Sequence, residues 1–239
     1  MDKDVTNEGQ LYEDAIGKIP AHTLELFASL SAKSATGSYS MQVPAPFSDL
    51  LLTVEPHVCP LLPSTNICLR YLSTHNLSNQ VVLDFGSGSG ALAIAAVCSG
   101  AAHVDAVDNT HEAVACTSRN AVACDMVDKI HAFASDGFSQ VSGRYNLIMA
   151  NIPIVFVREI VNEHNFGLYD EKWILHNHVL ANYRRYLMPG GSLQLCHVPL
   201  QPEWSFEKFE KYLAQSGATF GVALEMHQHG LPWRVYSLT

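Results

Sequence analysis

Residues 81–97, VVLDFGSGSGALAIAAV, constrain the fold of this chain more than any other segment. A short apolar run ends at Asp84, three glycines follow at alternate positions, and a second apolar run follows them. This pattern predicts a buried strand, a tight turn and the start of a helix. Because glycine has no Cβ, the turn allows close approach of a ligand to the backbone. Such a ligand would lie over the helix N-terminus, where free N–H groups point.

The spacing of the turn is Asp84-x-Gly86-x-Gly88-x-Gly90, which differs from the dinucleotide pattern Gly-x-Gly-x-x-Gly. A second predicted strand, 103–108, ends at Asp108, about twenty residues after the turn. In nucleotide-binding α/β units an acid at this place accepts the two ribose hydroxyls. The alternative for the glycines is a tight turn that binds no ligand. The alternative for Asp108 is an N-cap of the following helix.

Together these segments resemble the first two motifs of the class I S-adenosylmethionine-dependent methyltransferases. The likeness extends to Ser135-Asp136-Gly137, to YNLIMANIPI at 145–154 and to RYLMPGGSLQL at 185–195. The nearest pattern is the group that methylates glutamine side chains or nucleobase amines, whose apolar segment before the first motif is similar to residues 51–72. The resemblance implies an enzyme with a Rossmann-like fold of seven strands and S-adenosylmethionine as its cofactor.

The resemblance assigns the turn to the methionine part of the cofactor. Gly86, Gly88 and Gly90 would approach the methionine moiety. Asp84 would hold its amino group, directly or through water, or would only stabilise the turn.

The same resemblance assigns three further loops to adenosine. Asp108 would accept from both ribose hydroxyls, and Asn109 would flank the adenine. Asp136 would accept from the adenine amino group, with Gly137 or Phe138 beside the ring. A simple loop turn is the alternative for Asp136.

Asn151-Ile152-Pro153-Ile154 is similar to the family's Asn-Pro-Pro-Tyr motif, in which Asn holds a planar amine and the aromatic ring stacks on it. Asn151 therefore remains a polar anchor for an amine and is a candidate contact for the cofactor and the reaction. Ile152, Pro153 and Ile154 would line the substrate pocket. A planar amide or nucleobase acceptor is put in doubt, because the aromatic residue is replaced by Ile154.

Two more residues are candidates for catalysis. Tyr169 lies in a loop that would shape the substrate pocket, where its ring face would suit a sulfonium. His197 follows the fifth strand and would serve as a general base near neutral pH. A packed loop aromatic and a satisfied core histidine are the respective alternatives. No metal is expected, since His176 and His178 are two apart on a helix and cannot share a face.

From residue 81 onward strands and helices alternate, which predicts an α/β fold with a mostly parallel sheet and helices on both faces. The other predicted strands are 130–134, 145–151, one after the Pro189-Gly190-Gly191 turn, 219–226 and 233–238. The predicted helices are 64–74 with Ser64 as N-cap, 90–98, 111–123 with Thr110 as N-cap, 171–187 and 202–216.

We divide the chain into an N-terminal unit, 1–79, and a cofactor-binding core, 80–239. Residues 1–40 show partial apolar faces at helical spacing, with a Ser-rich connection over 31–40, and residues 41–79 a loop-rich bridge before the helix. The first helices would form a lid over the pocket, with Tyr12 and Tyr39 facing it. Packing of this segment on the core or on a second subunit, and thus a homodimer, is left open.

Composition limits the partners. The formal net charge is −9 with only 14 Lys and Arg, which argues against a nucleic-acid partner. The six cysteines form no Cys-x-x-Cys pair, and no signal peptide or membrane-length apolar run is present. These features predict a cytoplasmic protein with reduced thiols and no membrane contact.

The first functional hypothesis is N-methylation of a small amine-bearing molecule, as in secondary metabolism, with that molecule as the partner. The alternative is cyclisation of S-adenosylmethionine itself to azetidine-2-carboxylate and methylthioadenosine, as in synthases that resemble methyltransferases. A non-catalytic cofactor-binding subunit is a third option. Methylation of protein or RNA is disfavoured by the charge and by the missing aromatic residue.

Overall fold

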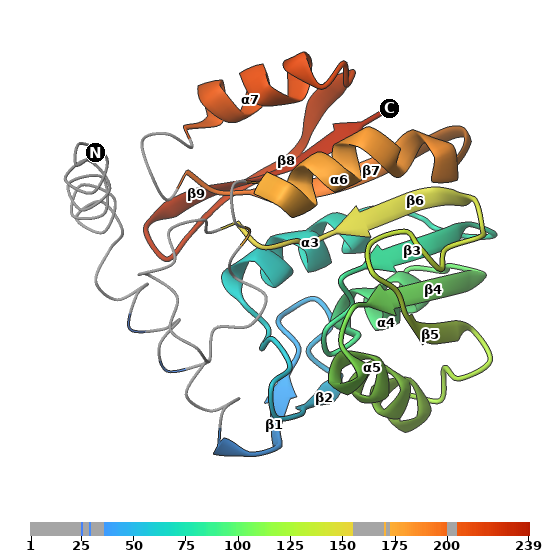
Figure 1. Cartoon of the computed structure of the whole chain (residues 1–239). Coiled ribbons are helices and arrows are strands. Elements are labelled where there is room, and N and C mark those ends of the chain that lie inside the picture. The colour runs from blue at the N-terminus through green and yellow to red at the C-terminus, as the bar shows by residue number, and fades with distance from the viewer. Residues whose placement is uncertain (1–24, 26–28, 30–35, 155–169, 171–172, 200–204) are drawn as a thin grey trace, which may run out of the picture.

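The computed structural model describes residues 25, 29, 36–154, 170, 173–199 and 205–239. At its centre is a seven-stranded sheet of order β5-β4-β3-β6-β7-β9-β8 (Figure 1). Strands β3 to β7 are parallel, and β9 is antiparallel to both neighbours. The predicted Rossmann-like methyltransferase fold is thereby confirmed. The strands are β3 Val81–Phe85, β4 His103–Asp108, β5 Ile130–Ala134, β6 Tyr145–Ala150, β7 Leu187–His197, β8 Phe220–Gln228 and β9 Leu231–Leu238.

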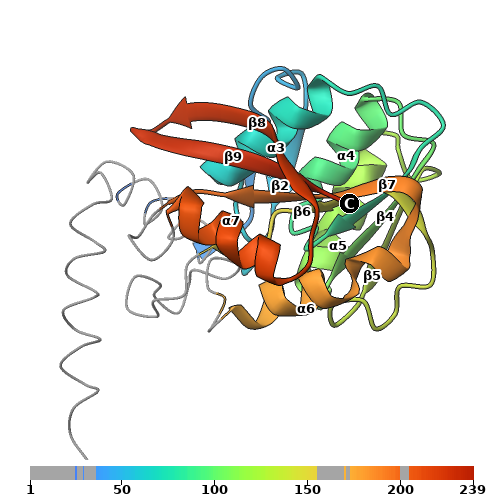
Figure 2. The ribbon, with the colours of Figure 1, turned by 90° about the horizontal axis from the view of Figure 1, so that it is seen from above.

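Helices cover both faces of the sheet, as Figure 2 shows. On one face lie α3 Pro63–Ser73, α4 Ala91–Cys98 and α5 His111–Ala123, which share one hydrophobic cluster with the strands. On the other face lie α6 Ile174–Asn182, a 3₁₀ turn Tyr183–Tyr186 and α7 Phe206–Gln215, which build a second cluster. The central strands β3 and β6 are buried on both sides, so they read as nearly continuous apolar runs in the sequence.

The helix starts follow local capping chemistry. The predicted cap of α5 is confirmed, because Thr110 Oγ1 accepts from the Ala113 N–H at 3.3 Å. The predicted Ser64 cap of α3 is wrong: Leu62 is the N-cap, and its N–H donates to Thr65 Oγ1 at 3.2 Å. The helix begins one residue earlier than predicted because Pro63 suits the first helical position, where no N–H partner is needed.

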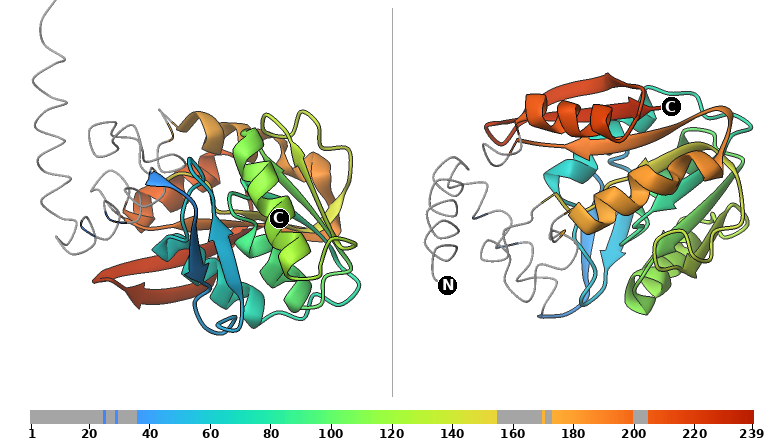
Figure 3. Two further views of the ribbon diagram at one scale, coloured as in Figure 1. Left: turned by 90° about the horizontal axis from the view of Figure 1, so that it is seen from below. Right: turned by 45° about the horizontal axis from the view of Figure 1, so that its top comes forward.

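A second, two-stranded sheet precedes the core. Strands β1 Tyr39–Gln42 and β2 Leu51–Val54 pair antiparallel beside α5 (Figure 3). The prediction of a connection up to residue 40 and of a loop-rich bridge after it was wrong here, because four-residue strands leave too short a pattern. Leu52 and Val54 are fully buried in the same cluster as α4. The division of the chain at 79/80 stays a prediction.

Other boundaries differ modestly from the expectation. The described part of the predicted helix 171–187 is α6 followed by the 3₁₀ turn. The Pro189-Gly190-Gly191 turn lies within β7, at a register shift against β6. The helical lid, with Tyr12, falls outside the described residues. Within the described part of the chain, no helix has the length and apolar character needed to cross a membrane.

Candidate functional site

A cavity of about 320 Å³ lies at the carboxyl ends of the central strands. Strand β3 has β4 on one side and β6 on the other, so the strand order reverses at this point. Ligands usually bind at such a point in an open α/β sheet. Four loops at the strand ends contribute polar and glycine residues to its lining: Gly86, Ser87, Gly88 and Ser89 after β3; Asp108, Asn109 and Thr110 after β4; Ser135, Asp136 and Gly137 after β5; Asn151 after β6. The sequence therefore located the edge correctly.

The glycine turn divides into two functions. Gly86 and Gly88 line the cavity with left-handed backbone, at φ +82° and +52°. A Cβ on Gly86 would meet no atom within 4 Å, so its backbone is open to a ligand. Gly90 does not line the cavity, and a Cβ there would come within 2.9 Å of Thr117. Gly90 thus serves close packing of α4 on α5.

Asp84 lies beneath the turn and is only 1% exposed. Its Oδ2 accepts from the Ala93 N–H at 3.0 Å, whereas Oδ1 is buried without a hydrogen-bond partner. Burial raises the pKa of this carboxyl to about 7, against the lowering by the Ala93 bond, and the charge of Asp108 raises it further. Asp84 is not among the residues that line the cavity, which favours its alternative role in stabilising the turn and α4.

Asp108 connects two cavity loops. Its Oδ2 accepts from the Gly88 N–H at 3.0 Å, and its Oδ1 accepts from the N–H and the hydroxyl of Thr110 at 3.1 and 3.0 Å. Thr110 is the N-cap of α5, so the alternative that made Asp108 the cap is wrong. Asp108 and Asn109 both line the cavity, and their contacts to ribose and adenine stay predictions.

At the third loop, Asp136 and Gly137 line the cavity. Gly137 has φ +56°, and a Cβ there would overlap the ring of His178. Phe138 lies deeper, 3% exposed, with its ring 4.7 Å from Phe85 and 4.5 Å from Tyr186. Of the two residues predicted beside the adenine, the structure brings Gly137 to the cavity and Phe138 to the core.

The fourth loop carries the divergent motif. Asn151 Nδ2 donates to Thr65 Oγ1 at 3.3 Å, and Asn151 Oδ1 is buried without a hydrogen-bond partner. Asn151, Ile152 and Pro153 line the cavity. Ile154 was predicted there but packs in the core, because its side chain faces the cluster of α3 and α4.

One wall of the cavity was missed by sequence reasoning. It consists of residues 57–61, between β2 and α3, together with Thr65. The only signal was the likeness of residues 51–72 to the segment before the family's first motif. Burial raises the pKa of the Cys59 thiol to about 12, and the charge of Asp108 adds to the shift, so this thiol is uncharged at neutral pH.

Two of the residues predicted for catalysis or for facing the pocket, His197 and Tyr39, do not line the cavity. His197 is 1% exposed and stacks on Phe209, with ring centroids 3.9 Å apart and planes 4° from parallel. It does not line the cavity, which favours the core alternative. Tyr39 lies in β1 with a buried hydroxyl, also outside the lining. Tyr169 and Tyr12 lie outside the described residues.

Among the residues that the structure describes, no group of three or more His, Cys, Asp or Glu side chains is arranged to hold a metal ion. The groups that converge on the cavity are instead two carboxylates, Asp108 and Asp136, the amide of Asn151, and the open backbone of the glycine turn. These are groups that suit a nucleoside with a charged amino-acid tail.

Comparison with known proteins decides the family. A sequence model of the ribosomal protein L11 methyltransferase family, PrmA, matches residues 62–185, just over half of the 239 residues. The chain belongs to the PrmA family. It is therefore a member of the class I S-adenosylmethionine-dependent methyltransferases, and the predicted cofactor and enzyme class are confirmed as those of its family.

Among PrmA relatives, the ribosomal protein L11 methyltransferase of Shewanella frigidimarina is 40% identical over 90 residues, 38% of this chain and 30% of that protein. The one from Geobacter sp. strain M21 is 29% identical over 175 residues, 69% of this chain and 57% of that protein. The matched segments thus span less than two thirds of these relatives.

Two solved structures show the same fold. The ribosomal protein L11 methylase of Lactobacillus delbrueckii subsp. bulgaricus has a TM-score of 0.52 at 24% identity, covering 73% of this chain and 78% of that one. The T. thermophilus 16S rRNA N2 G1207 methyltransferase, solved with AdoMet and guanosine, has a TM-score of 0.65 at 19% identity, covering 85% of this chain and 50% of that one.

The family corrects the functional hypotheses. Methylation of a small molecule in secondary metabolism is wrong, and cyclisation to azetidine-2-carboxylate has no support, because PrmA proteins are named for methylating a ribosomal protein. The partner prediction, a small molecule with nucleic acid disfavoured, is overturned by the same finding. Neither the missing aromatic residue at position 154 nor the net charge of −9 excludes a protein substrate. A homodimer and a cytoplasmic location stay predictions.

Proposed function

We propose that this chain is an S-adenosylmethionine-dependent N-methyltransferase that acts on an amine of a ribosomal protein. The observation that carries the proposal is the PrmA match over residues 62–185. That span contains every residue that lines the cavity except 57–61, so the family likeness is a likeness of the site itself.

The polar groups and the glycine backbone on the cofactor side of the cavity fit S-adenosylmethionine. Asp108 presents a carboxylate to the cavity for the ribose hydroxyls, and Asp136 presents one for the adenine amine. Gly86 and Gly88 leave room for the methionine tail over the start of α4. When bound, the cofactor supplies an activated methyl group together with its leaving group.

The acceptor side is centred on Asn151. Its Nδ2 is held by Thr65, which leaves Oδ1 as a buried acceptor without a partner. An amine N–H that donates to Oδ1 would be fixed in direction, so that its lone pair could face the methyl group. The contribution of the chain is then orientation and exclusion of water, which is where most of the rate gain of such a transfer originates.

The residues beside Asn151 indicate the type of amine. Ile152 and Pro153 line the cavity and offer apolar surface without an aromatic ring face. This surface suits the aliphatic stem of a lysine or an N-terminal amine better than a planar amide or base, which would gain from stacking. We therefore assign an aliphatic protein amine as the acceptor.

The test is methyl transfer followed by intact mass. Purified chain, S-adenosylmethionine and ribosomal protein L11 should yield L11 heavier by whole methyl groups, with S-adenosylhomocysteine as the second product. Asp108→Ala should lose cofactor binding. Asn151→Ala should bind S-adenosylhomocysteine as the unaltered chain does but lose most of the transfer. Unchanged L11 mass in the presence of measured cofactor binding would overturn the assigned acceptor.

A further inference from the structure

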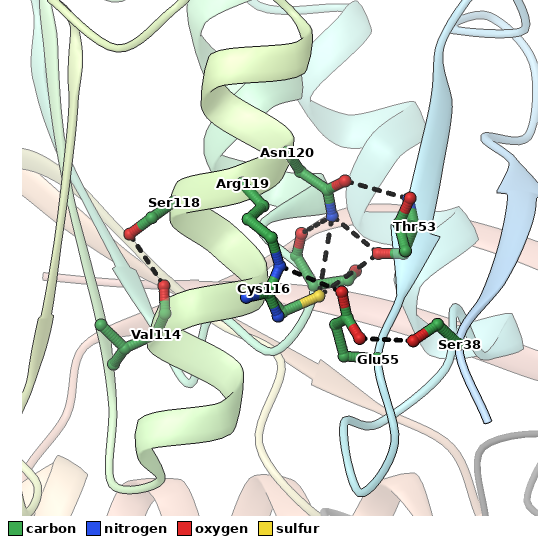
Figure 4. Close-up of polar contacts among 9 residues, drawn as sticks. Ser38, Thr53, Glu55, Val114, Cys116, Ser118, Arg119 and Asn120 are labelled. Carbon is green, nitrogen blue, oxygen red and sulfur yellow. Dashed lines mark hydrogen bonds and ion pairs between the residues drawn. The ribbon is translucent and has the colours of Figure 1, made fainter. Parts of the chain in front are cut away.

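Asn120, in the middle of α5, bonds to two segments that lie far from it in sequence (Figure 4). Its Nδ2 donates to the carbonyl of Thr53 in β2 and to the carbonyl of Ser89 in the glycine turn, both at 2.8 Å. Its Oδ1 accepts from the Thr53 N–H at 2.9 Å. The side chain is 2% exposed, so these bonds form out of contact with water.

Only one orientation of the amide satisfies all three partners. The NH₂ group must face the two carbonyls and the oxygen must face the Thr53 N–H, since a carbonyl cannot donate. Asn120 therefore bonds to both the N–H and the carbonyl of Thr53 in β2, as the backbone of a neighbouring strand would. Its second N–H bonds to Ser89 in the glycine turn. Because all three hydrogen bonds are buried, substitution of this amide would leave buried backbone groups without their partners, which is costly.

The two bonded segments lead to two parts of the cavity lining. From Thr53 the chain runs within a few residues to the wall 57–61, and Ser89 belongs to the wall formed by the glycine turn. The two walls come close, because a Cβ placed on Gly88 would lie 3.8 Å from the Cys59 carbonyl oxygen. The two segments therefore lie side by side at the cavity, and Asn120 is bonded to the chain of both.

Neighbouring side chains of α5 support the same junction. Thr117 Oγ1 donates to the Gly88 carbonyl at 3.1 Å, and Cys116 Sγ donates to the Thr53 carbonyl at 3.2 Å. Residues 116 and 120 are four apart, so they share one helix face. Arg119 and Ser118 do not contact the turn: Arg119 pairs with Glu55 at 3.0 Å, and Ser118 bonds to Val114 within α5.

We propose that Asn120 is a positioning residue that couples the β1–β2 sheet, and with it the wall 57–61, to the cofactor-binding turn. It touches no cofactor itself. Affinity for the cofactor then depends on a bond to β2, and cofactor binding in turn makes the small sheet more rigid. This inference rests on the proposed cofactor site but not on the proposed acceptor.

The first measurement is calorimetric titration of the full chain with S-adenosylhomocysteine. We expect Asn120→Ala to weaken binding about tenfold, as loss of buried hydrogen bonds of ordinary strength would. Asn120→Asp should weaken it more, because a carboxylate oxygen would face two carbonyls. The controls Ser118→Ala and Val122→Ala, at exposed positions of the same helix, should stay within about twofold.

The second measurement separates coupling from mere loss of stability. Hydrogen exchange of the peptide that spans residues 51–54 should slow when S-adenosylhomocysteine binds to the unaltered chain and to both controls. In Asn120→Ala it should not respond to the ligand. Asn120→Ser, which keeps a hydroxyl for one carbonyl only, gives a milder variant with an intermediate effect should the alanine variant not fold.

Equal affinity in Asn120→Ala, or ligand-dependent protection of residues 51–54 that survives the substitution, would overturn the coupling. Failure of the unaltered chain to bind S-adenosylhomocysteine would instead overturn the proposed cofactor site. Binding of the cofactor without transfer to L11 leaves the coupling test valid, because neither measurement uses the acceptor.

Discussion

Helices α4 and α6 begin in the same unusual way on opposite faces of the sheet. Each has an N-cap residue in the left-handed region, Gly90 at φ 80° and Trp173 at φ 60°, and neither cap uses its own side chain. In both, a buried aspartate accepts first-turn N–H groups instead: Asp84 accepts from α4, and Asp170 from α6.

The two carboxylates differ in how well they are satisfied. Asp170 accepts from the N–H of Leu175 at 2.8 Å, the N–H of His176 at 3.0 Å and the His176 Nδ1 at 2.7 Å. Although burial raises its pKa, these bonds lower it below the usual value overall. Asp84 has one donor and a raised pKa. Asp84 is buried more deeply and has fewer donors, and both differences favour its neutral form. The helix beside the cavity thus has the less satisfied acid.

The largest expected effect is the difference between the two alanine variants in the free energy of unfolding. Asp170→Ala removes three bonds to a charged acceptor and should cost about 3 kcal/mol, whereas Asp84→Ala removes one and should cost about 1 kcal/mol. Urea denaturation at pH 7 measures both. The exposed Asp128→Ala is the control and should change stability by less than about 0.5 kcal/mol. Equal losses at 84 and 170 would show that the comparison of donors is mistaken.

Next in size is the cap of α4. Gly90→Ala should cost about 2 kcal/mol, because it adds left-handed strain and brings Cβ within 2.9 Å of Thr117. Gly86→Ala has the same strain at φ +82° but meets no atom within 4 Å, so it should cost about 1 kcal/mol. Denaturation midpoints of the two variants in parallel give the difference. Equal costs would mean that α4 moves freely away from α5.

A smaller effect is expected from the pH dependence of Asp84. Its pKa is raised to about 7 in the folded chain, from 3.8, so protonation favours folding. Its stabilising contribution is complete below 3.8 and is lost as pH rises through about 7. The side chain introduced by Asp84→Asn does not titrate. The free energy of unfolding of this variant, relative to that of the unaltered chain, should therefore rise by about 1 kcal/mol or more between pH 4 and 8. A constant difference would mean that Asp84 is ionised throughout.

The smallest effect has the opposite sign. Burial lowers the pKa of His176 below 6.5, against the raising by its bond to Asp170, so the neutral ring favours folding. That contribution is complete above pH 6.5 and is lost as pH falls below it. The advantage of the unaltered chain over His176→Asn should therefore shrink as the pH falls from 7 to 5. Growth of that advantage in acid would contradict the neutral assignment.

The sequence predicted those parts of the fold that depend on long local patterns. The bounds of β4, β5 and α5 agree with the prediction because alternation, helical spacing and the Thr110 cap lie within each segment. The sheet β1–β2 could not be predicted in this way. It depends on the bonds of Thr53 to Asn120, 67 residues later in the chain, which leave no periodic signal.

The site follows the same division. Asp108, Asp136, Gly86 and Gly88 were located at the cavity because each lies at or just after the end of a strand, and strand ends meet at one edge of a parallel sheet. The wall 57–61 and the buried stack of His197 on Phe209 were not, since both depend on packing between distant segments. The acceptor class was misjudged because three residues of a divergent motif outweighed the family pattern of the surrounding sequence.

The state of Cys59 has a practical consequence for chemical labelling. Alkylating reagents attack thiolates, and this cavity thiol, with its pKa raised to about 12, holds its proton at neutral pH. Cys98 is exposed at the end of α4, on the outer surface. The pKa of Cys98 is also raised, by partial burial and by Cys124, so exposure rather than ionisation distinguishes the two thiols. A fluorophore coupled at mildly alkaline pH would label Cys98 in preference to the cavity thiol, which gives an attachment point for optical binding assays.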